Sequence, residues 1–588
     1  MATWGCQKLS LFPRRVYTKK MMKSHTHTQS GAALIIFLTI LILGITAILL
    51  SELNTRNDLM LEDQEQTRRA LTQAKEALIG YAASYYDYDE QQGMYGFLPC
   101  PDLRINVIPE GEEDGSCGST DKSSLGRLPW KKIGLSLLRD GAKECLWYAV
   151  SGPYKQSPRT SLLNEDTNGL FNVSVSDGTG TLQLTGSQPQ DRAVAVIIAP
   201  GKILSNQNRT PVNKGKGVEI CGGKYEPTAY LETDVNNLVD DDFEGFLTAQ
   251  DIAAQNTDNA NPINDRIVYI TREELWGAIR KRRDFLRNMQ CLTKVTALCV
   301  ANYVKTNTGF SDDGNFSNDD KRLPWPAPVA LTDYRSNTKR KLFNNYVTEY
   351  DDQSTNLSGR LPNKVNDSND NDKINKTVPP DYLIIAPEVK ETETVLTGCN
   401  FSTIASTVDL SICNNSAAIN LVELRNCNGD PNCNGDPKNA HCKSVPNDAN
   451  CKDNNAVKAF KNLWENWKDH LFYAVADAHQ PNAITPTPFC DSSNCLEVNG
   501  NYYAAIIIFA AEPLAGQIRN DPTLVPESGK DKIYNYLEGS NIRSFPTVEG
   551  GEGLNDGKGS YQQWNISNNI NDILYCINGN LEVGTCPP

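Results

Sequence analysis

The sequence predicts an α+β protein in which a long N-terminal membrane-spanning helix precedes two tandemly duplicated lobes, each built from a helix and an antiparallel sheet. Three observations lead to this fold class. An uncharged apolar run occupies residues 32–50, an amphipathic pattern continues beyond it, and a series of short signatures occurs twice in the same order. The second lobe also carries a large insert rich in Cys and Asn, at about residues 326–466.

The apolar run from Ala32 to Leu50 contains 19 residues. As a helix it would measure roughly 28 Å, which is enough to cross the hydrocarbon core of a bilayer. The residues before it include several lysines and arginines and no acid, whereas acids follow it from Glu52 onward. Positive charge stays on the cytoplasmic side, so the bulk of the chain is expected in the periplasm. A secretory signal peptide is the alternative, but its apolar core is usually only about 7–15 residues long.

The helix is expected to continue past the membrane. From Glu52 to Tyr86 the chain contains no proline. Apolar residues recur there at spacings of three and four, namely Leu71, Ala74, Leu78, Tyr81 and Tyr85. This spacing is typical of one apolar helix face. We therefore expect a continuous helix of about 54 residues, half of it in lipid and half forming the spine of a soluble domain.

Charge and cysteine content agree with export. The formal net charge is −14, which argues against binding to nucleic acid or to an anionic membrane surface. Of 17 cysteines, Cys6 precedes the apolar run and the others follow it, as expected for disulfides formed in an oxidising periplasm. Short loops favour three local pairs, which are Cys100 with Cys117, Cys490 with Cys495, and Cys576 with Cys586.

An internal duplication is the strongest signal after the apolar run. The first series consists of RLPW (127–130), ECLWYAV (144–150), AVAVIIAPG (193–201), YLE (230–232) and NDRIVYI (264–270). The second consists of RLPW (322–325), DHLFYAV (469–475), AAIIIFAAEP (504–513), YLE (536–538) and NDILYCI (571–577). The step from the RLPW arginine to the YAV tyrosine is 21 residues in the first series and 151 in the second, which predicts the insert.

These patterns predict the following organisation. A basic leader occupies 1–31, a transmembrane helix 32–50, a first lobe with its helical spine 51–270, a connector helix 271–283, and a second lobe 284–588. The apolar runs in each series are short and rich in β-branched residues, which favours strands buried on both faces. The helix of the second lobe is expected around Phe285 to Tyr303.

The insert contains candidate metal ligands, but we expect no resident cofactor. Zinc is the alternative to disulfides for the run Cys427, Cys433, Cys442 and Cys451, with His441 among them; the spacings are not those of paired zinc ligands. Calcium is a further alternative at the repeated Asn-Gly-Asp segments and at Asp312, Asp313 and Asp319. Neither cluster matches the spaced calcium loop with its terminal glutamate. A loop held by disulfides is therefore the favoured interpretation.

No pattern indicates an enzyme. The three histidines beyond the apolar run are His441, His470 and His479, and no zinc-protease pair, nucleophile elbow or phosphate-binding glycine loop is present in the sequence. His470 takes the position of Cys145 in the duplicated series. We interpret it as a structural histidine rather than a catalytic one.

The border of the leader, Gln29-Ser30-Gly31-Ala32-Ala33-Leu34-Ile35-Ile36, resembles the prepilin signal of type IV pilins and type II secretion pseudopilins. The resemblance implies that a prepilin peptidase cuts after Gly31 and methylates the new amine of Ala32. The leader is long for this family, and a start at Met22 would give a more usual length. Residues 32–86 fit the same family, and segments such as ECLWYAVSG resemble large uncharacterised prepilin-like proteins.

One position departs from the family. Most such pilins have Glu at the fifth mature position, where this chain has Ile36. A carboxylate in hydrocarbon persists where it finds a partner, so a chain without it resembles the largest minor pseudopilin, which caps a filament tip. The resemblance implies a low-copy minor pilin or pseudopilin, single-pass in the bacterial inner membrane, that contacts lipid and other pilins through its N-terminal helix. The alternative is a permanently anchored periplasmic binding or adhesive module.

Overall fold

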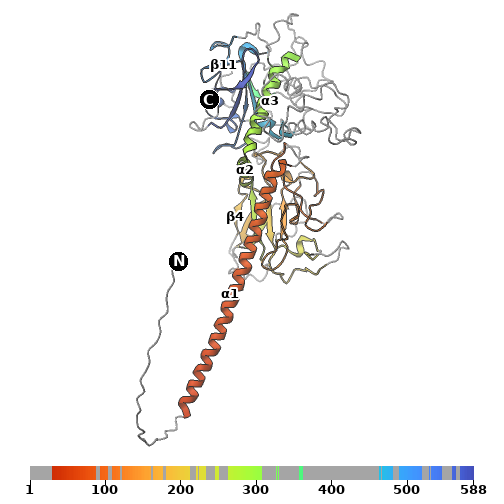
Figure 1. Ribbon diagram of the computed structural model, residues 1–588, viewed down its shortest axis with the longest axis vertical. Helices are drawn as coiled ribbons and strands as arrows, with labels where there is room; N and C mark the ends of the chain where they lie inside the picture. The colour runs from red at the N-terminus through yellow and green to blue at the C-terminus, as the bar shows by residue number, and fades with distance from the viewer. Residues whose placement is uncertain are drawn as a thin grey trace, which may run out of the picture. The chain divides into compact units, whose positions relative to one another are not determined.

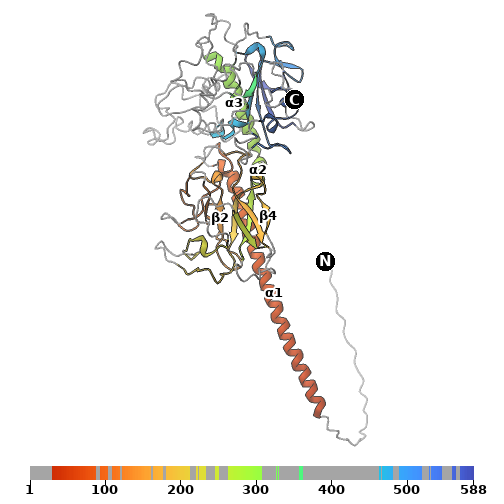
Figure 2. The ribbon, with the colours of Figure 1, turned by 180° about the vertical axis from the view of Figure 1, so that it is seen from behind.

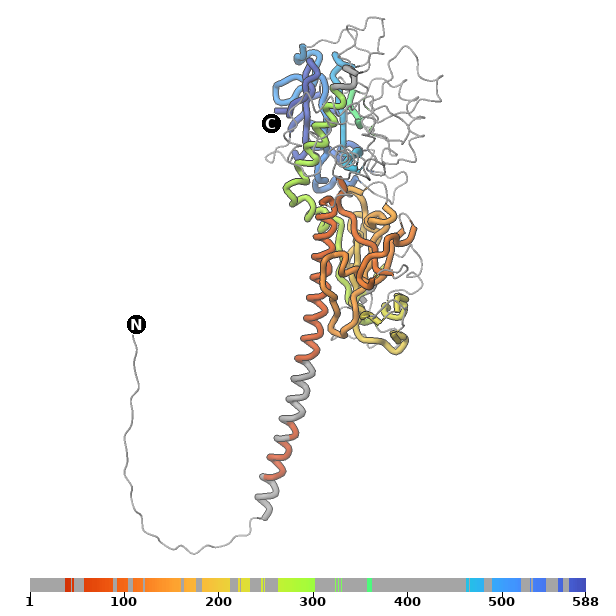
Figure 3. Tube along the Cα trace, turned by 45° about the vertical axis from the view of Figure 1, so that its right-hand side comes forward, coloured from red at the N-terminus to blue at the C-terminus, as the bar shows by residue number. Residues whose placement is uncertain are grey.

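The computed structural model describes most of residues 30–306, a few positions between 323 and 361, and most of residues 462–587. Figure 3 draws in grey the residues whose placement is not described. Most of the predicted insert lies outside the described residues. So do the cysteines and His441 considered for zinc and the aspartates considered for calcium. The described residues form an α+β architecture with a long N-terminal helix and four sheets.

The chain divides into two compact units, Met1–Glu62 and Asp63–Pro588. The helix α1 (Ser30–Ser84) begins in the first unit and ends in the second. Between Phe37 and Ile45 the large apolar side chains that are described are 45–67% exposed. Among residues with described side chains, no helix is both long enough and apolar enough to cross a bilayer. The predicted leader lies almost wholly outside the described residues, and so do the side chains of about half of the predicted span.

The first lobe is built on a four-stranded antiparallel sheet. Its strand order is β1 (Ser124–Arg127), β2 (Trp147–Val150), β5 (Ala193–Ala199) and β7 (Arg266–Thr271). A smaller sheet has the order β4 (Thr181–Thr185), β3 (Asn172–Ser176) and β6 (Gly245–Ala249), in which β3 pairs antiparallel with β4 and parallel with β6. Figure 2 shows both sheets, with β2 and β4 labelled.

The central strand β5 is buried on both faces, as its unbroken apolar sequence predicts. Ala195 and Ile197 join a core with the C-terminal part of α1, whereas Val196 and Ile198 join a second core with residues of the smaller sheet. The predicted apolar stripe of α1 is confirmed, because Leu71, Ala74, Leu78, Tyr81 and Tyr85 are all buried in the first of these cores. The helix therefore serves as the spine of this lobe.

Two helices follow β7. The helix α2 (Arg272–Arg280) begins at a capping box, in which the Thr271 side chain accepts from the Glu274 amide and the Glu274 side chain accepts from the Thr271 amide. The helix α3 (Arg283–Thr306) then starts two residues before the expected Phe285. In α2 the buried residues are Leu275, Trp276 and Ile279, which belong to the same core as α1 and α3.

The second lobe repeats this plan. Its main sheet has the order β15 (Val583–Thr585), β14 (Ile573–Ile577), β12 (Ala505–Phe509), β9 (Leu471–Val475) and β8 (Ser358–Arg360), with every pair antiparallel. Its smaller sheet has the order β11 (Asn501–Tyr503), β10 (Leu496–Val498) and β13 (Ser560–Tyr561), again with one antiparallel and one parallel pair. A short helix, α9 (Gly539–Arg543), precedes β13. Figure 1 shows α3 lying along the strands of this lobe, against β12 and β14.

Strand pairing corrects one part of the predicted repeat. Gly126 of β1 lies opposite Tyr148 of β2, and Gly359 of β8 lies opposite Tyr473 of β9. The partner of Arg127 is therefore Arg360, which belongs to a second GRLP segment at 359–362, and not Arg322. Both arginines stack on aromatic rings of their own lobe, Arg127 on Trp147 and Tyr230, and Arg360 on Phe472 and Tyr536.

Leu323, the described residue of the RLPW segment at 322–325, takes a different place. The Leu323 amide donates to the His479 carbonyl over 2.7 Å, just as the Leu98 amide donates to the Tyr154 carbonyl over 2.8 Å. Leu323 thus matches Leu98 of the LPCP segment. The inserted chain must then begin after β8 rather than at residue 326, because β8 is an edge strand of the main sheet. A four-letter match was too short to fix the register.

In each lobe the glutamate of the YLE signature contacts the Asn-Asp signature through hydrogen bonds. In the first lobe the amides of Asn264 and Asp265 donate to Glu232, and the Glu232 amide donates to Asp265 over 2.8 Å. Glu538 and Asp572 repeat the arrangement in the second lobe. Burial, followed by the neighbouring Glu232 carboxylate, raises the pKa of Asp265 well above its usual range. These signatures therefore mark buried structural acids.

The packing of α1 leads to a first prediction. Leu78 is fully buried, so Leu78→Ala should lower the free energy of unfolding of the full chain by about 2–5 kcal/mol, through lost transfer energy and the cavity left behind. Urea unfolding measures this change. Gln73→Ala on the exposed side of the same helix is the matched control and should change stability by less than about 0.5 kcal/mol. Equal effects of the two substitutions would contradict the assignment of the buried face.

Candidate functional site

The structure does not describe the side chains at the predicted processing site, but it does describe the predicted disulfides. Gly31 and Ala32 lie in the helical backbone of α1, but their side chains are outside the described residues. The structure joins Cys100 to Cys117, Cys490 to Cys495, and Cys576 to Cys586, which are the pairs that the short loops favour. The disulfides indicate an oxidising, extracytoplasmic location for the folded lobes.

A fourth disulfide joins Cys145 to Cys221 across 76 residues. Short loop length could not predict this disulfide, because the many cysteine pairs separated by long loops are not distinguished by that criterion. Its place in the fold is informative, since Cys145 lies two residues before β2 and the corresponding residue of the second lobe, His470, directly precedes β9. A crosslink in one lobe is thus replaced by a titratable ring in the other.

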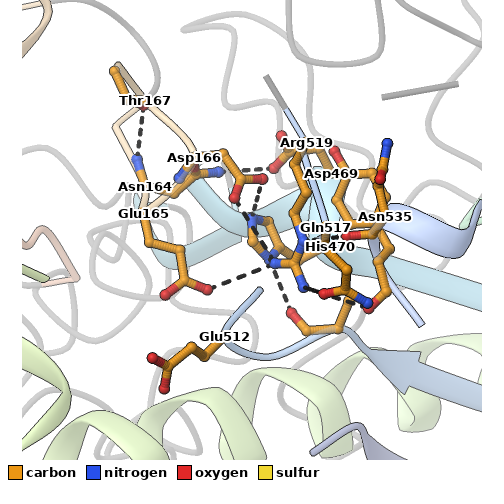
Figure 4. A network of polar contacts seen from close by, with 12 residues as sticks. Asn164, Glu165, Asp166, Thr167, Asp469, His470, Glu512, Gln517, Arg519 and Asn535 are labelled. Carbon is orange, nitrogen blue, oxygen red and sulfur yellow. Dashed lines mark hydrogen bonds and ion pairs between the residues drawn. The ribbon is translucent and has the colours of Figure 1, made fainter. Parts of the chain in front are cut away.

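His470 belongs to a buried polar cluster that joins the two lobes. The first lobe contributes the loop Asn164–Thr167, which lies between β2 and β3. The second contributes Asp469 and His470 from the 3-10 helix η8 (Lys468–His470), together with Arg519 from the segment after β12. We call Asn164, Glu165, Asp166, Asp469, His470 and Arg519 the junction cluster. Figure 4 shows these side chains converging on His470.

The His470 ring is held on both of its nitrogens. Nε2 lies 3.0 Å from Oδ2 of Asp166, and Nδ1 lies 2.9 Å from the carbonyl oxygen of Ala510. The Ala510 carbonyl can only accept, so Nδ1 donates to it, while Nε2 faces the Asp166 carboxylate at ion-pair distance. A guanidinium nitrogen of Arg519 also lies 3.3 Å from Nδ1. The ring also packs against Trp467 and Phe509, with centroids 5.0 Å and 5.7 Å away.

Uncharged groups complete the contact between the lobes. The Asn164 side-chain amide donates to the Asn466 carbonyl over 2.8 Å and to Oδ1 of Asp469 over 2.9 Å. The Leu163 amide donates to Oδ1 of Asn466 over 2.9 Å. The loop itself is fixed by the Asp166 amide, which donates to Oδ1 of Asn164. The junction is therefore specified by directional bonds as well as by charge.

The charged groups in the cluster shift one another's pKa values. Burial disfavours the imidazolium, but the carboxylates of Asp166 and Asp469 outweigh it and raise the pKa of His470 above its ordinary value. Burial also raises the pKa of Glu165, and the positive charges of Arg519 and His470 offset this only in part. Arg519 lies 3.7 Å from Glu165 and 3.8 Å from Asp166. The surrounding carboxylates therefore favour the charged form of His470 more than water does.

Two groups of side chains have the composition of metal ligands. In the first, atoms of Asp166, Asp469 and His470 lie within 4.8 Å of one another. Arg519 already provides positive charge there, and the pKa of His470 is raised, so the donor set fits an ion-pair cluster better than a cation. The second consists of His479, Cys490 and Cys495, but these two cysteines form a disulfide, and a metal thiolate needs them reduced.

A cavity of about 480 Å³ lies beside the junction cluster. Its lining includes Glu165, Arg280 and Glu512 together with aromatic residues of α3 and of the second lobe. Neither the cavity nor the position of the loop Asn164–Thr167 was predicted from the sequence. Nothing in the local pattern marks this loop, because an acidic stretch between strands usually faces solvent.

No family model, curated protein or solved structure matches this chain.

The junction cluster leads to a second prediction. Asp166→Asn removes the carboxylate that faces His470 and leaves buried positive charge without its nearest partner. It should lower the free energy of unfolding by about 3 kcal/mol, as expected when one member of a buried ion pair is removed. Urea unfolding at neutral pH measures the change. Asp477→Asn, at an exposed site beyond β9, is the control, and an equally small effect of both substitutions would contradict the role of the cluster.

The raised pKa of His470 leads to a third prediction. The folded state holds this proton to a higher pH than the unfolded state, so its stabilisation is complete below the unfolded pKa of about 6.5 and is lost as pH rises through the folded value. Asp166, Asp469, Glu165 and Arg519 face the ring, and the raised pKa of Glu165 adds to the same trend. Stability should therefore fall between pH 6.5 and alkaline pH more steeply in the wild type than in His470→Gln. Parallel curves would contradict the prediction.

Proposed function

We propose that this chain is a prepilin-like protein of the bacterial envelope, inserted once in the inner membrane with its N-terminus in the cytoplasm. After cleavage by prepilin peptidase it joins a type IV pilus or a type II secretion pseudopilus as a low-copy minor subunit, at or near a filament tip. Its partners are other pilins or pseudopilins, contacted through the N-terminal helix, and membrane lipid.

The division of labour within α1 carries this proposal. The helix has 55 residues, and its C-terminal part is the buried spine of a sheet, with Ala74 and Leu78 fully covered. The described large apolar side chains between Phe37 and Ile45 are uncovered in this chain. An exposed apolar surface of this kind needs lipid or another apolar helix around it. One helix that leaves lipid at one end and organises a globular domain at the other supports assembly by helix stacking.

The low copy number rests on two observations. Ile36 stands where most pilins have a glutamate, so the helix lacks the carboxylate that would pair with the amine of a neighbouring subunit. The chain is also large, at 65.0 kDa. We further propose that the two lobes arose by duplication, supported by the shared sheet orders β1-β2-β5-β7 and β8-β9-β12-β14, and that the chain has no catalytic role.

Processing provides the test and a fourth prediction. When the chain is produced together with a prepilin peptidase, intact mass spectrometry of the membrane fraction should give a mature protein that starts at a methylated Ala32. Gly31→Leu should stay uncut, because a bulky side chain would then occupy the residue before the cleaved bond. Ser30→Ala, one residue further away, should be processed as the wild type is.

An uncut wild type would overturn the proposal and favour the alternative, a permanently anchored periplasmic binding or adhesive module. Release of the folded lobes into the medium without the N-terminal helix would overturn both. Circular dichroism of the Gly31→Leu protein keeps the test sound, because an unchanged spectrum excludes a folding defect as the reason for the lost cleavage.

A further inference from the structure

The cavity beside the junction cluster has the size of a small-molecule site. Its volume of about 480 Å³ lies within the range of roughly 300–1,000 Å³ typical of ligand pockets. It lies inside the compact unit Asp63–Pro588, and it is lined from the first lobe by Glu165, from α2 by Arg280, and from the second lobe by the remaining residues. It therefore exists only while the lobes are joined.

One wall of the cavity is apolar and aromatic. Trp467 is its centre, with the Phe285 ring at 5.5 Å and the Phe509 ring at 5.9 Å between centroids. Met289 and Ile573 continue this wall. Aromatic surfaces of this kind accommodate a flat apolar body, and their faces attract cations.

The polar end of the cavity carries surplus negative charge. Arg280 meets three carboxylates, those of Glu165 at 3.1 Å, Glu273 at 2.6 Å and Glu512 at 2.8 Å. Its single positive charge cannot neutralise all three, and Arg519 is shared with Asp166. Figure 4 shows Glu165 and Glu512 next to each other at the edge of the junction cluster. An anion entering here would have to displace carboxylates from Arg280, whereas a cation would be attracted to them.

Glu512 is the carboxylate best placed to meet a ligand. Its side chain is 48% exposed, while those of Glu165 and Arg280 are nearly buried. It can turn from Arg280 towards an incoming charge without exposing an apolar core, and Arg280 would keep Glu165 and Glu273. Glu273 also binds Arg280 but is 73% exposed and does not line the cavity.

We propose that this cavity binds a small organic cation, consisting of an ammonium group on a flat apolar body. The body lies against Trp467, Phe285 and Phe509, and the ammonium group lies between Glu512 and Glu165. This site is independent of cleavage and of filament assembly, because every residue in it belongs to the joined lobes.

The test, and a fifth prediction, uses the full chain in detergent and two probes with the same aromatic body. Isothermal titration calorimetry should show that phenethylammonium binds and that phenylpropionate, which carries a carboxylate instead, binds at least about tenfold more weakly. Glu512→Gln should weaken phenethylammonium binding by about tenfold, because it removes one facing charge. Glu273→Gln is the matched control, since it removes a carboxylate from the same arginine outside the cavity and should change binding less than about twofold.

Met289→Trp fills the cavity from α3 and should abolish binding of both probes, while an unchanged thermal unfolding curve shows that the lobes remain folded. Equal affinity for the two probes would overturn the assignment of charge. Full binding to Met289→Trp would place the ligand elsewhere on the protein. Failure of the wild type to bind either probe at millimolar concentration would show that the cavity is filled by the chain itself, and that outcome also overturns the proposal.

Discussion

The contact between a histidine and an aspartate, both buried between the two lobes, constrains how the lobes pack together. Charges removed from water are destabilising unless each one faces an opposite charge and its hydrogen bonds are made. The His470 ring faces the opposite charge of Asp166 and makes a hydrogen bond to the Ala510 carbonyl. Any movement that separates the lobes would leave these groups unpaired in an apolar surrounding, where Trp467 and Phe509 offer no substitute. The arrangement favours two states of the junction, closed or open to water, over intermediate ones.

The two lobes share a plan, and both contribute to the junction. Both lobes hold the same sheet order and the same contact between their YLE and Asn-Asp segments. Just before the second strand of each main sheet, one lobe has Cys145 in a disulfide and the other has His470 in the cluster. The position of the stabilising disulfide in the first lobe is thus the position of a contact between the lobes in the second. The cavity is the space left beside this contact, so its chemistry follows from the same charged residues.

Local sequence patterns predicted much of the fold. The stripe through Leu71, Ala74 and Leu78 identified the buried face of α1 because a helix fixes which residues share a face. The run Ala193–Ala199 identified a central strand because its residues are apolar on both faces. The position of β8 was not predicted, because the RLPW match at 322–325 was assigned to this place, whereas β8 contains Gly359 and Arg360 of the GRLP segment at 359–362.

The junction cluster could not have been predicted by the same means. Asp166 and His470 meet only through the packing of whole lobes, and no periodicity links positions so far apart. The sequence identified His470 as a structural histidine from its place in the repeat, but the repeat does not predict its partners, since the matching Cys145 is bonded to Cys221 instead. In the sequence, Glu165 and Asp166 resemble an ordinary solvent-exposed acidic turn. In the structure both side chains are buried.

Distance along the chain has a consequence for biogenesis. Asn164 and Asp469 are 305 positions apart, so a nascent chain completes its first lobe long before the residues that will cover the Asn164–Thr167 loop have been made. During that interval Glu165 and Asp166 are hydrated, and the surface they share with α2 is open. A chaperone that holds the growing polypeptide would meet this acidic patch on one side and unpaired apolar side chains of α3 on the other. Completion of the second lobe hides both at once, and this gives quality control a simple mark of an unfinished molecule.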